Sequence, residues 1–164
     1  MLLVTTSIPA AGAIITYNVV LSGAQSVPAN VTTAFGNATV TVDDVLNSVS
    51  VVLNFSGLTG GNAGAAHIHC CSLTTATAPV VIPFTGFPSA TSGNYSNTFT
   101  GVSLTNINGI KAGLAYINIH DATFPAGEIR GNIVTPEPAT LSLMGLGLLA
   151  LIGARAKRNR HAAR

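Results

Sequence analysis

The chain contains few charged residues and no tryptophan. Only 7% of its 164 residues are charged, against ~25% in typical soluble domains, so Thr, Ser, Asn and Gly supply most of the polarity. Residues 14–135 carry two basic and four acidic side chains, and the basic excess lies in the C-terminal tail. The body therefore lacks the electrostatic footprint of a nucleic-acid-binding protein. A surface rich in hydroxyls and amides is instead typical of secreted β-proteins.

A helical period, an internal repeat and a coiled-coil pattern are also missing between the two ends of the chain. Apolar and polar residues alternate instead, as in half-buried strands. Segment 106–113 (NINGIKAG) is expected to be a turn, because Gly and Asn dominate it. This pattern predicts seven or eight short strands in an all-β, Greek-key β-sandwich over residues 14–135. Strands are expected over 16–23, 37–43, 48–58, 66–70, 78–84, 95–104, 114–120 and 127–133, with 78–84 at an edge because prolines flank it.

Residues 1–13 (MLLVTTSIPAAGA) are apolar and rich in small residues, and their last three fit a signal-peptidase site. A signal peptide normally begins with Lys or Arg, and neither is present here. We therefore expect a degraded or truncated signal peptide. The alternative is that this segment forms the first strand.

The C-terminal segment 136–164 has three elements in a fixed order. A Pro-Glu-Pro triplet is followed by an apolar run of 16 residues over 139–154, slightly shorter than the ~20 that span a bilayer as a helix. A basic cluster then holds the C-terminal end in the cytoplasm. The triplet is Pro136, Glu137 and Pro138, and the cluster begins with Arg155, Lys157 and Arg158.

This arrangement resembles the PEP-CTERM sorting signal of bacterial exported proteins. The resemblance implies an exosortase-type processing protease as a partner, because that membrane enzyme recognises the triplet and removes the tail. It also implies an exported chain whose short C-terminal hydrophobic helix lies outside the domain. The tail would insert transiently in the inner membrane, and the protein would then reach the cell surface or the extracellular space.

The stretch GAAHIHCC, over 64–71, holds two of the four histidines and both cysteines. Strand alternation places His67 and His69 on one face, and His120 lies on the polar face of a later strand. Three histidines so placed could bind one Cu or Zn ion. The other hypothesis is a hydrogen-bonded network in which His120, Glu128 and Arg130 satisfy one another, because Arg130 would be unfavourable beside a cation. Both hypotheses stay open.

Adjacent cysteines in an exported protein suggest oxidation. Strand alternation would aim the sulfurs of Cys70 and Cys71 apart. A strained disulfide in a turn, an intermolecular bridge and two free thiols are therefore all open.

Three segments resemble, in order, those of the CHRD domain, which is named for chordin and also occurs in bacterial exported proteins. They are LSGAQSVPANVTTAFGNATVTVD, LNFSGLTGGNAGAAHIH and GLAYINIHDATFPAGEIRGNI, and the resemblance covers 17–134. It implies an immunoglobulin-like or superoxide-dismutase-like sandwich without an established catalytic activity. Two positions depart from the family: Ser26 replaces an acidic residue, and the two cysteines replace a small turn residue.

The sequence thus favours an exported, non-enzymatic protein of the cell surface or matrix. It would be associated with exopolysaccharide or biofilm material and need no cofactor. One alternative is an extracytoplasmic Cu- or Zn-binding or redox domain that uses His67, His69 and His120. A second alternative is a self-assembling structural subunit whose strand edges pair between copies.

Overall fold

The computed structural model describes residues 12–134. The expected C-terminal sorting segment, 136–164, lies outside these residues, as does the expected signal segment 1–13 except for its last two residues. Within 12–134, no helix combines the length and the apolar character that crossing a bilayer requires.

The described residues form eight strands, one short α-helix and one turn of 3-10 helix, which confirms the all-β expectation. The alternating segments of the sequence become these strands with small shifts at their ends, except that the strand expected over 95–104 ends at Phe99 and its last residue, Leu104, begins α1. The helices are η1 (Gly23–Gln25) and α1 (Leu104–Lys111). The strands are β1 (Ile14–Ser22), β2 (Phe35–Asp43), β3 (Ser48–Ser56), β4 (Ala65–Cys70), β5 (Val80–Pro83), β6 (Gly93–Phe99), β7 (Ala115–His120) and β8 (Ile129–Ile133).

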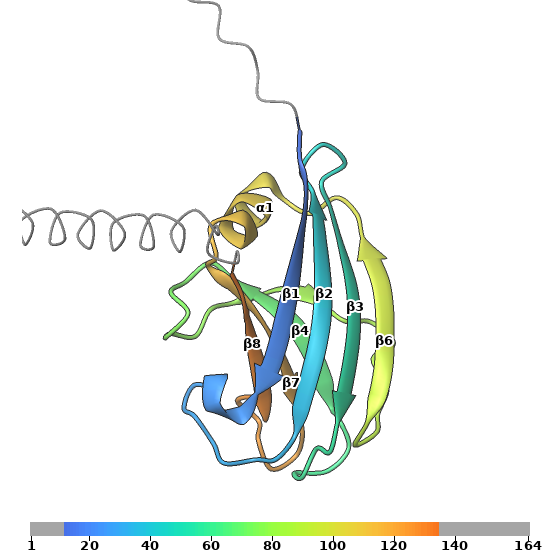
Figure 1. Cartoon of the computed structure of the whole chain (residues 1–164), viewed down its shortest axis with the longest axis vertical. Helices are drawn as coiled ribbons and strands as arrows, with labels where there is room; N and C mark the ends of the chain where they lie inside the picture. The colour runs from blue at the N-terminus through green and yellow to red at the C-terminus, as the bar shows by residue number, and fades with distance from the viewer. Residues whose placement is uncertain (1–11, 135–164) are drawn as a thin grey trace, which may run out of the picture.

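All eight strands belong to one antiparallel sheet with the order β5-β4-β7-β8-β1-β2-β3-β6. The sheet folds into two layers, and Figure 1 shows β1, β2, β3 and β6 in front of β8, β7 and β4. Strands β1 and β8 connect the two layers by backbone pairing at one pair of residues, Ser22 of β1 and Arg130 of β8. Long connections place β6 beside β3 and β7 beside β4, which is Greek-key connectivity. As expected from its prolines, β5 is an edge strand.

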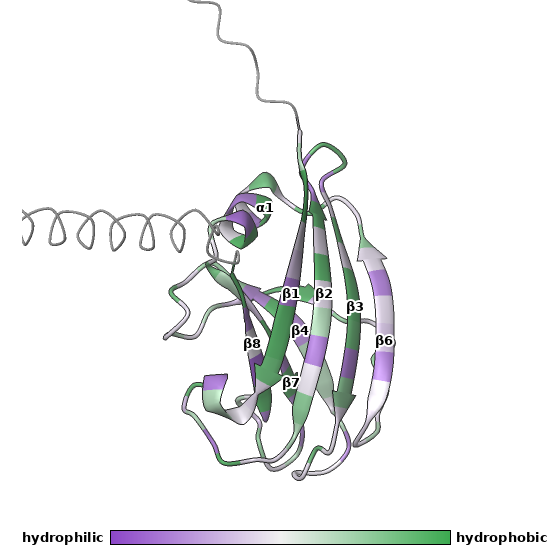
Figure 2. Cartoon of the chain, in the orientation of Figure 1, coloured by the Kyte–Doolittle hydropathy of each residue, from purple (hydrophilic) through white to green (hydrophobic). Residues whose placement is uncertain are grey.

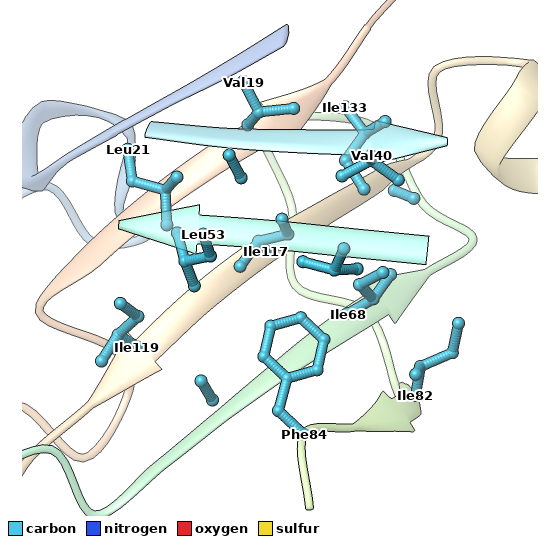
Figure 3. Packing of buried hydrophobic residues seen from close by; sticks show 14 of the residues in the cluster. Val19, Leu21, Val40, Leu53, Ile68, Ile82, Phe84, Ile117, Ile119 and Ile133 are labelled. Carbon is cyan, nitrogen blue, oxygen red and sulfur yellow. The ribbon is translucent and has the colours of Figure 1, made fainter. Parts of the chain in front are cut away.

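The core lies between the two layers and follows the predicted alternation. Val40 of β2 and Leu53 of β3 are fully buried from one layer, and Ile68 of β4 and Ile117 of β7 meet them from the other (Figure 3). The exposed positions of the front layer alternate with these buried ones, so hydrophilic and apolar bands succeed each other along its strands (Figure 2). Burying a side chain of this size contributes about 1.5–3 kcal/mol.

Helix α1 corrects the expectation of a turn over 106–113. Its N-cap is Ser103, whose hydroxyl accepts a hydrogen bond from the backbone N–H of Asn106. Ile107 and Ile110 lie one turn apart and are fully buried, so tertiary packing outweighs the poor helix propensity of the Asn and Gly residues around them.

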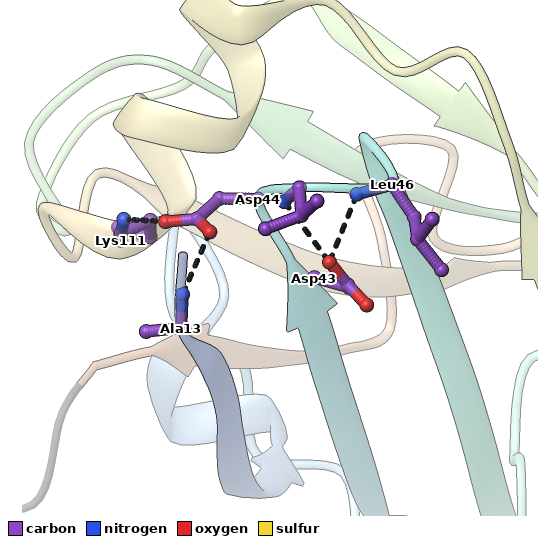
Figure 4. Close-up of polar contacts among 6 residues, drawn as sticks. Ala13, Asp43, Asp44, Leu46 and Lys111 are labelled. Atoms are coloured by element: carbon purple, nitrogen blue, oxygen red, sulfur yellow. Dashed lines mark hydrogen bonds and ion pairs between the residues drawn. The ribbon is translucent and has the colours of Figure 1, made fainter. Parts of the chain in front are cut away.

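An ion pair ties the end of α1 to the start of β1. Lys111 donates to the carboxylate of Asp44, which also accepts from the backbone N–H of Ala13 at 2.8 Å (Figure 4). The hydrogen bond from Lys111 lowers the pKa of Asp44 below its usual range. In the same turn Asp43 accepts from the backbone N–H groups of Val45 and Leu46.

Candidate metal centre

The pairing of β4 with β7 brings three histidines together. His67 and His69 lie on the same face of β4, and Asn118 and Tyr116 are their direct partners on β7. His120 lies two positions beyond Asn118 on that same face. The ring centroid of His67 is 5.6 Å from that of His69 and 5.2 Å from that of His120. One ring nitrogen from each residue can be chosen so that all three lie within 4.8 Å of one another.

Backbone carbonyls fix the orientation of two of the rings. Nδ1 of His69 lies 2.7 Å from the carbonyl oxygen of Ala78, and Nδ1 of His120 lies 2.9 Å from that of Pro125. A carbonyl oxygen only accepts hydrogen bonds, so each Nδ1 carries the proton and each Nε2 presents its lone pair. A backbone carbonyl on the far ring nitrogen is a usual feature of metal-binding histidines.

Three ring nitrogens in this cluster are buried without a hydrogen-bond partner. They are Nδ1 of His67, Nε2 of His69 and Nε2 of His120. Buried polar atoms in native proteins nearly always have partners, and each exception calls for an explanation. Three such atoms in neighbouring rings are what a binding site for a cation would contain.

The electrostatics keep the imidazoles in the form that binds metals. Burial lowers the pKa of His67 below its ordinary value, and the neighbouring histidines add to this effect. Burial also lowers the pKa of His120, against an opposing effect of its hydrogen bond to Pro125. Both rings are therefore neutral at pH 7, and a metal ion need not displace a proton from them.

The separation of the three nitrogens fits one small ion after a modest adjustment. Nitrogens about 2.0–2.1 Å from a Zn²⁺ ion lie about 3.3–3.6 Å apart. The nitrogens here lie within 4.8 Å of one another, so the rings must close by at most about 1.5 Å to reach those distances. Imidazole nitrogen suits both copper and zinc, and the histidines alone do not choose between them.

Tyr116 and Arg130 support the cluster from the side. The Tyr116 ring stacks on His69 with a centroid distance of 4.7 Å and an interplanar angle of 4°. The Arg130 guanidinium lies over the Tyr116 ring, 3.4 Å from its centroid. It donates to the carbonyls of Thr74 and Ala76 at 2.7 and 3.0 Å. Arg130 therefore holds the loop after β4 against the sheet.

Glu128 does not join the histidines, and the network expected among His120, Glu128 and Arg130 does not form. Glu128 precedes β8 and turns toward another loop, where it accepts hydrogen bonds from the hydroxyl of Thr32 and from the backbone and hydroxyl of Thr59. Burial raises the pKa of Glu128, but the groups around the carboxylate, among them the hydrogen bonds from these threonines, outweigh it and lower the pKa to about 2.

The two cysteines form a disulfide with each other, so the intrachain bridge is the one of the three alternatives that the structure contains. The chain leaves the regular strand at Cys70, and alternation no longer sets the direction of Cys71. Both sulfurs lie against Gly109 of α1, where there is no space for a Cβ atom. No free cysteine remains in residues 12–134.

Tyr116 and Asn118 alternate along β7 on the same face as His120, but no sequence signal indicated their roles. The stack of Tyr116 on His69 depends on the β4–β7 register. The carbonyls of Ala78 and Pro125 come from irregular loops, and any residue type supplies a carbonyl. The sequence therefore indicated the three candidate ligands but not the groups that orient them.

Two known protein families match most of the chain. The PEP-CTERM protein-sorting motif matches residues 134–158, which include the Pro-Glu-Pro triplet and most of the basic cluster. This motif marks an exported protein that exosortase-type machinery sorts to the cell envelope. No curated protein and no solved structure gave a match. The CHRD domain matches residues 17–133, nearly all of the described sheet, and the chain therefore belongs to the CHRD domain family.

Proposed function

We propose that this exported domain binds one copper or zinc ion through His67, His69 and His120, and that it acts by binding and not by catalysis. Two observations carry the proposal: three buried ring nitrogens of this cluster have no hydrogen-bond partner, and one nitrogen from each ring lies within 4.8 Å of the others. A purely structural histidine network would use these nitrogens to satisfy one another or nearby polar groups. Instead, their lone pairs are left available, and two of the rings are held by carbonyls on their opposite nitrogens.

The sorting motif supports a place of action at the cell surface or in the surrounding matrix. Once the C-terminal segment is removed, nothing in the proposal requires the domain to stay in the membrane. The outer face of the front layer offers neutral amides and hydroxyls, such as those of Asn18, Thr39 and Asn54. These groups suit contact with neutral exopolysaccharide in the matrix, where the domain would retain its metal ion.

Metal titration of the purified full chain tests this function. The wild-type protein, stripped with a chelator, is titrated with Cu²⁺ and with Zn²⁺ by calorimetry, and the bound metal is measured by elemental analysis. We expect one ion per chain. His69→Ala and His120→Ala should each weaken binding by at least about tenfold, since each removes one of three ligands.

The fourth histidine, His161, provides the matched control, because it is not one of the three proposed ligands. His161→Ala should bind as tightly as the wild type. The proposal is wrong if the wild type binds neither metal at micromolar concentrations. It is also wrong if His161→Ala weakens binding as much as His69→Ala does.

A further inference from the structure

The sheet ends in two very different edge strands. At one edge, β5 has only four residues and ends on Pro83, and the pairing of its neighbour β4 shifts register between Ile68 and His69. Short length, proline and irregular register are the devices by which proteins prevent an edge strand from pairing with another chain. The β5 edge is therefore protected.

At the other edge, β6 carries none of these devices. Its seven residues pair with β3 in one unbroken register, from Gly93 opposite Phe55 to Phe99 opposite Val49. The strand contains no proline and no charged residue. Figure 1 shows β6 at the open side of the front layer, and Figure 2 shows that it is polar to neutral along its length. An uncharged, regular edge is a template for a further strand.

The exposed side chains of β6 would not repel a second copy. Asn94, Ser96 and Thr98 point outward and are neutral. The backbone N–H of Thr98 is already bonded to the side chain of Asn97 at 2.8 Å, which places the centre of any pairing at Asn94 and Ser96. Peptide groups that face away from β3 at these two residues supply the donors and acceptors that an antiparallel partner needs.

We propose that two copies of this chain pair β6 to β6, antiparallel about a two-fold axis, so that their sheets become continuous. A two-fold interface uses the same surface on both partners and closes on itself. The protected β5 edge cannot continue the sheet at the far side. The assembly therefore stops at a dimer and does not grow into a filament. This interface lies on the layer opposite β4 and is independent of the metal centre.

Site-specific crosslinking of the full chain tests the proposal directly. Ser96→Cys places a thiol at the centre of the interface, and the native cysteines are already bonded to each other. The matched control is Thr39→Cys on β2. The register pairs Ser96 with Val52 of β3 and Val52 with Thr39 of β2, so the three residues form one row across the sheet. The control thus lies on the same face as Ser96 but two strands from the edge. A short bis-maleimide should crosslink the Ser96→Cys variant into dimers much faster than the Thr39→Cys variant, even if the apolar tail gathers chains in detergent.

A charge substitution measures the strength of the interface. Ser96→Lys brings two like charges together across the two-fold axis and should raise the dimer dissociation constant by at least about tenfold. Thr39→Lys adds the same charge in the same row and should leave it unchanged. Sedimentation velocity reads out both. Equal crosslinking at the two cysteine positions, a wild type that stays monomeric in the upper micromolar range, or open-ended filaments would each overturn the proposal.

Discussion

The stack of Arg130, Tyr116 and His69 gives a quantitative test of what holds the candidate site in place. Tyr116 is 3% exposed and Arg130 is 2% exposed, so the guanidinium lies over the ring with little solvent screening. A desolvated cation–π contact contributes about 2 kcal/mol, and aromatic stacking adds about 1 kcal/mol. The Tyr116 hydroxyl also accepts a hydrogen bond from the backbone N–H of Ala78 at 3.1 Å. This bond contributes about 1 kcal/mol.

Two substitutions separate these contributions. Tyr116→Phe removes only the hydroxyl and should lower the free energy of unfolding by about 1 kcal/mol. Tyr116→Leu also removes the aromatic ring while keeping an apolar side chain, so the loss should reach about 4 kcal/mol. Urea unfolding at pH 7 measures both, provided that the dependence on urea concentration is unchanged. The Leu variant should also weaken metal binding by about tenfold, because it frees the His69 ring.

A second buried tyrosine provides the control. Tyr95 donates to the carbonyl of Thr85 at 3.2 Å and stacks on Phe84, and no arginine lies over its ring among the described residues. The Tyr95 hydroxyl also accepts a hydrogen bond from the side-chain amide of Asn97 at 3.2 Å. Tyr95→Phe removes both bonds and should cost about 2 kcal/mol, about twice as much as Tyr116→Phe. The reasoning fails if Tyr116→Leu is no more destabilising than Tyr116→Phe. In that case the guanidinium and the His69 ring would contribute nothing through the stack.

Three further predictions follow from burial, titration and the disulfide. Leu53 is fully buried and its neighbour Val52 is 51% exposed. In thermal unfolding, Leu53→Ala should therefore lower the free energy of unfolding by about 3 kcal/mol and Val52→Ala by less than about 1 kcal/mol. Similar losses of stability in the two variants would contradict the faces assigned to these residues. Because burial lowers the pKa of His67 and His120, the unfolded chain takes up protons at a higher pH than the folded one, and the metal-free protein should lose stability as the pH falls from 7.5 to 5.5. A double variant with Asn at both positions should show a flatter dependence, and a wild type that gains stability over this range would exclude neutral histidines. Mass spectrometry should find no alkylation of Cys70 or Cys71 before reduction and two labels after it, whereas labelling without reductant would show free thiols.

The sequence predicted the faces of the strands better than their neighbours. Alternation is local, so the burial of Val40 and Leu53 and the common face of His67 and His69 could be inferred from adjacent residues. The pairing of β4 with β7 joins segments about fifty residues apart and depends on how the whole sheet closes. For that reason the convergence of His120 with the other histidines remained a hypothesis until the structure was known.

The features that the sequence missed come from tertiary packing. Asn106, Asn108 and Gly109 indicate a turn by local propensity, and only the burial of Ile107 and Ile110 makes the segment helical. Glu128 was grouped with the histidines because it alternates with Arg130. It lies just before β8, however, and its side chain bonds a different loop. At the end of a strand, alternation no longer fixes the direction of a side chain.

The separation of the histidines along the chain has a consequence for how the proposed site would acquire an ion. Two ligands lie next to each other on β4, while the third arrives only when β7 pairs with that strand. An unfolded chain therefore has no three-coordinate site, and the full affinity of the proposed site would appear only once β4 and β7 have paired. The compartment in which the chain folds would then choose the ion. For an exported protein, the metals available outside the cytoplasm would decide whether copper or zinc is bound.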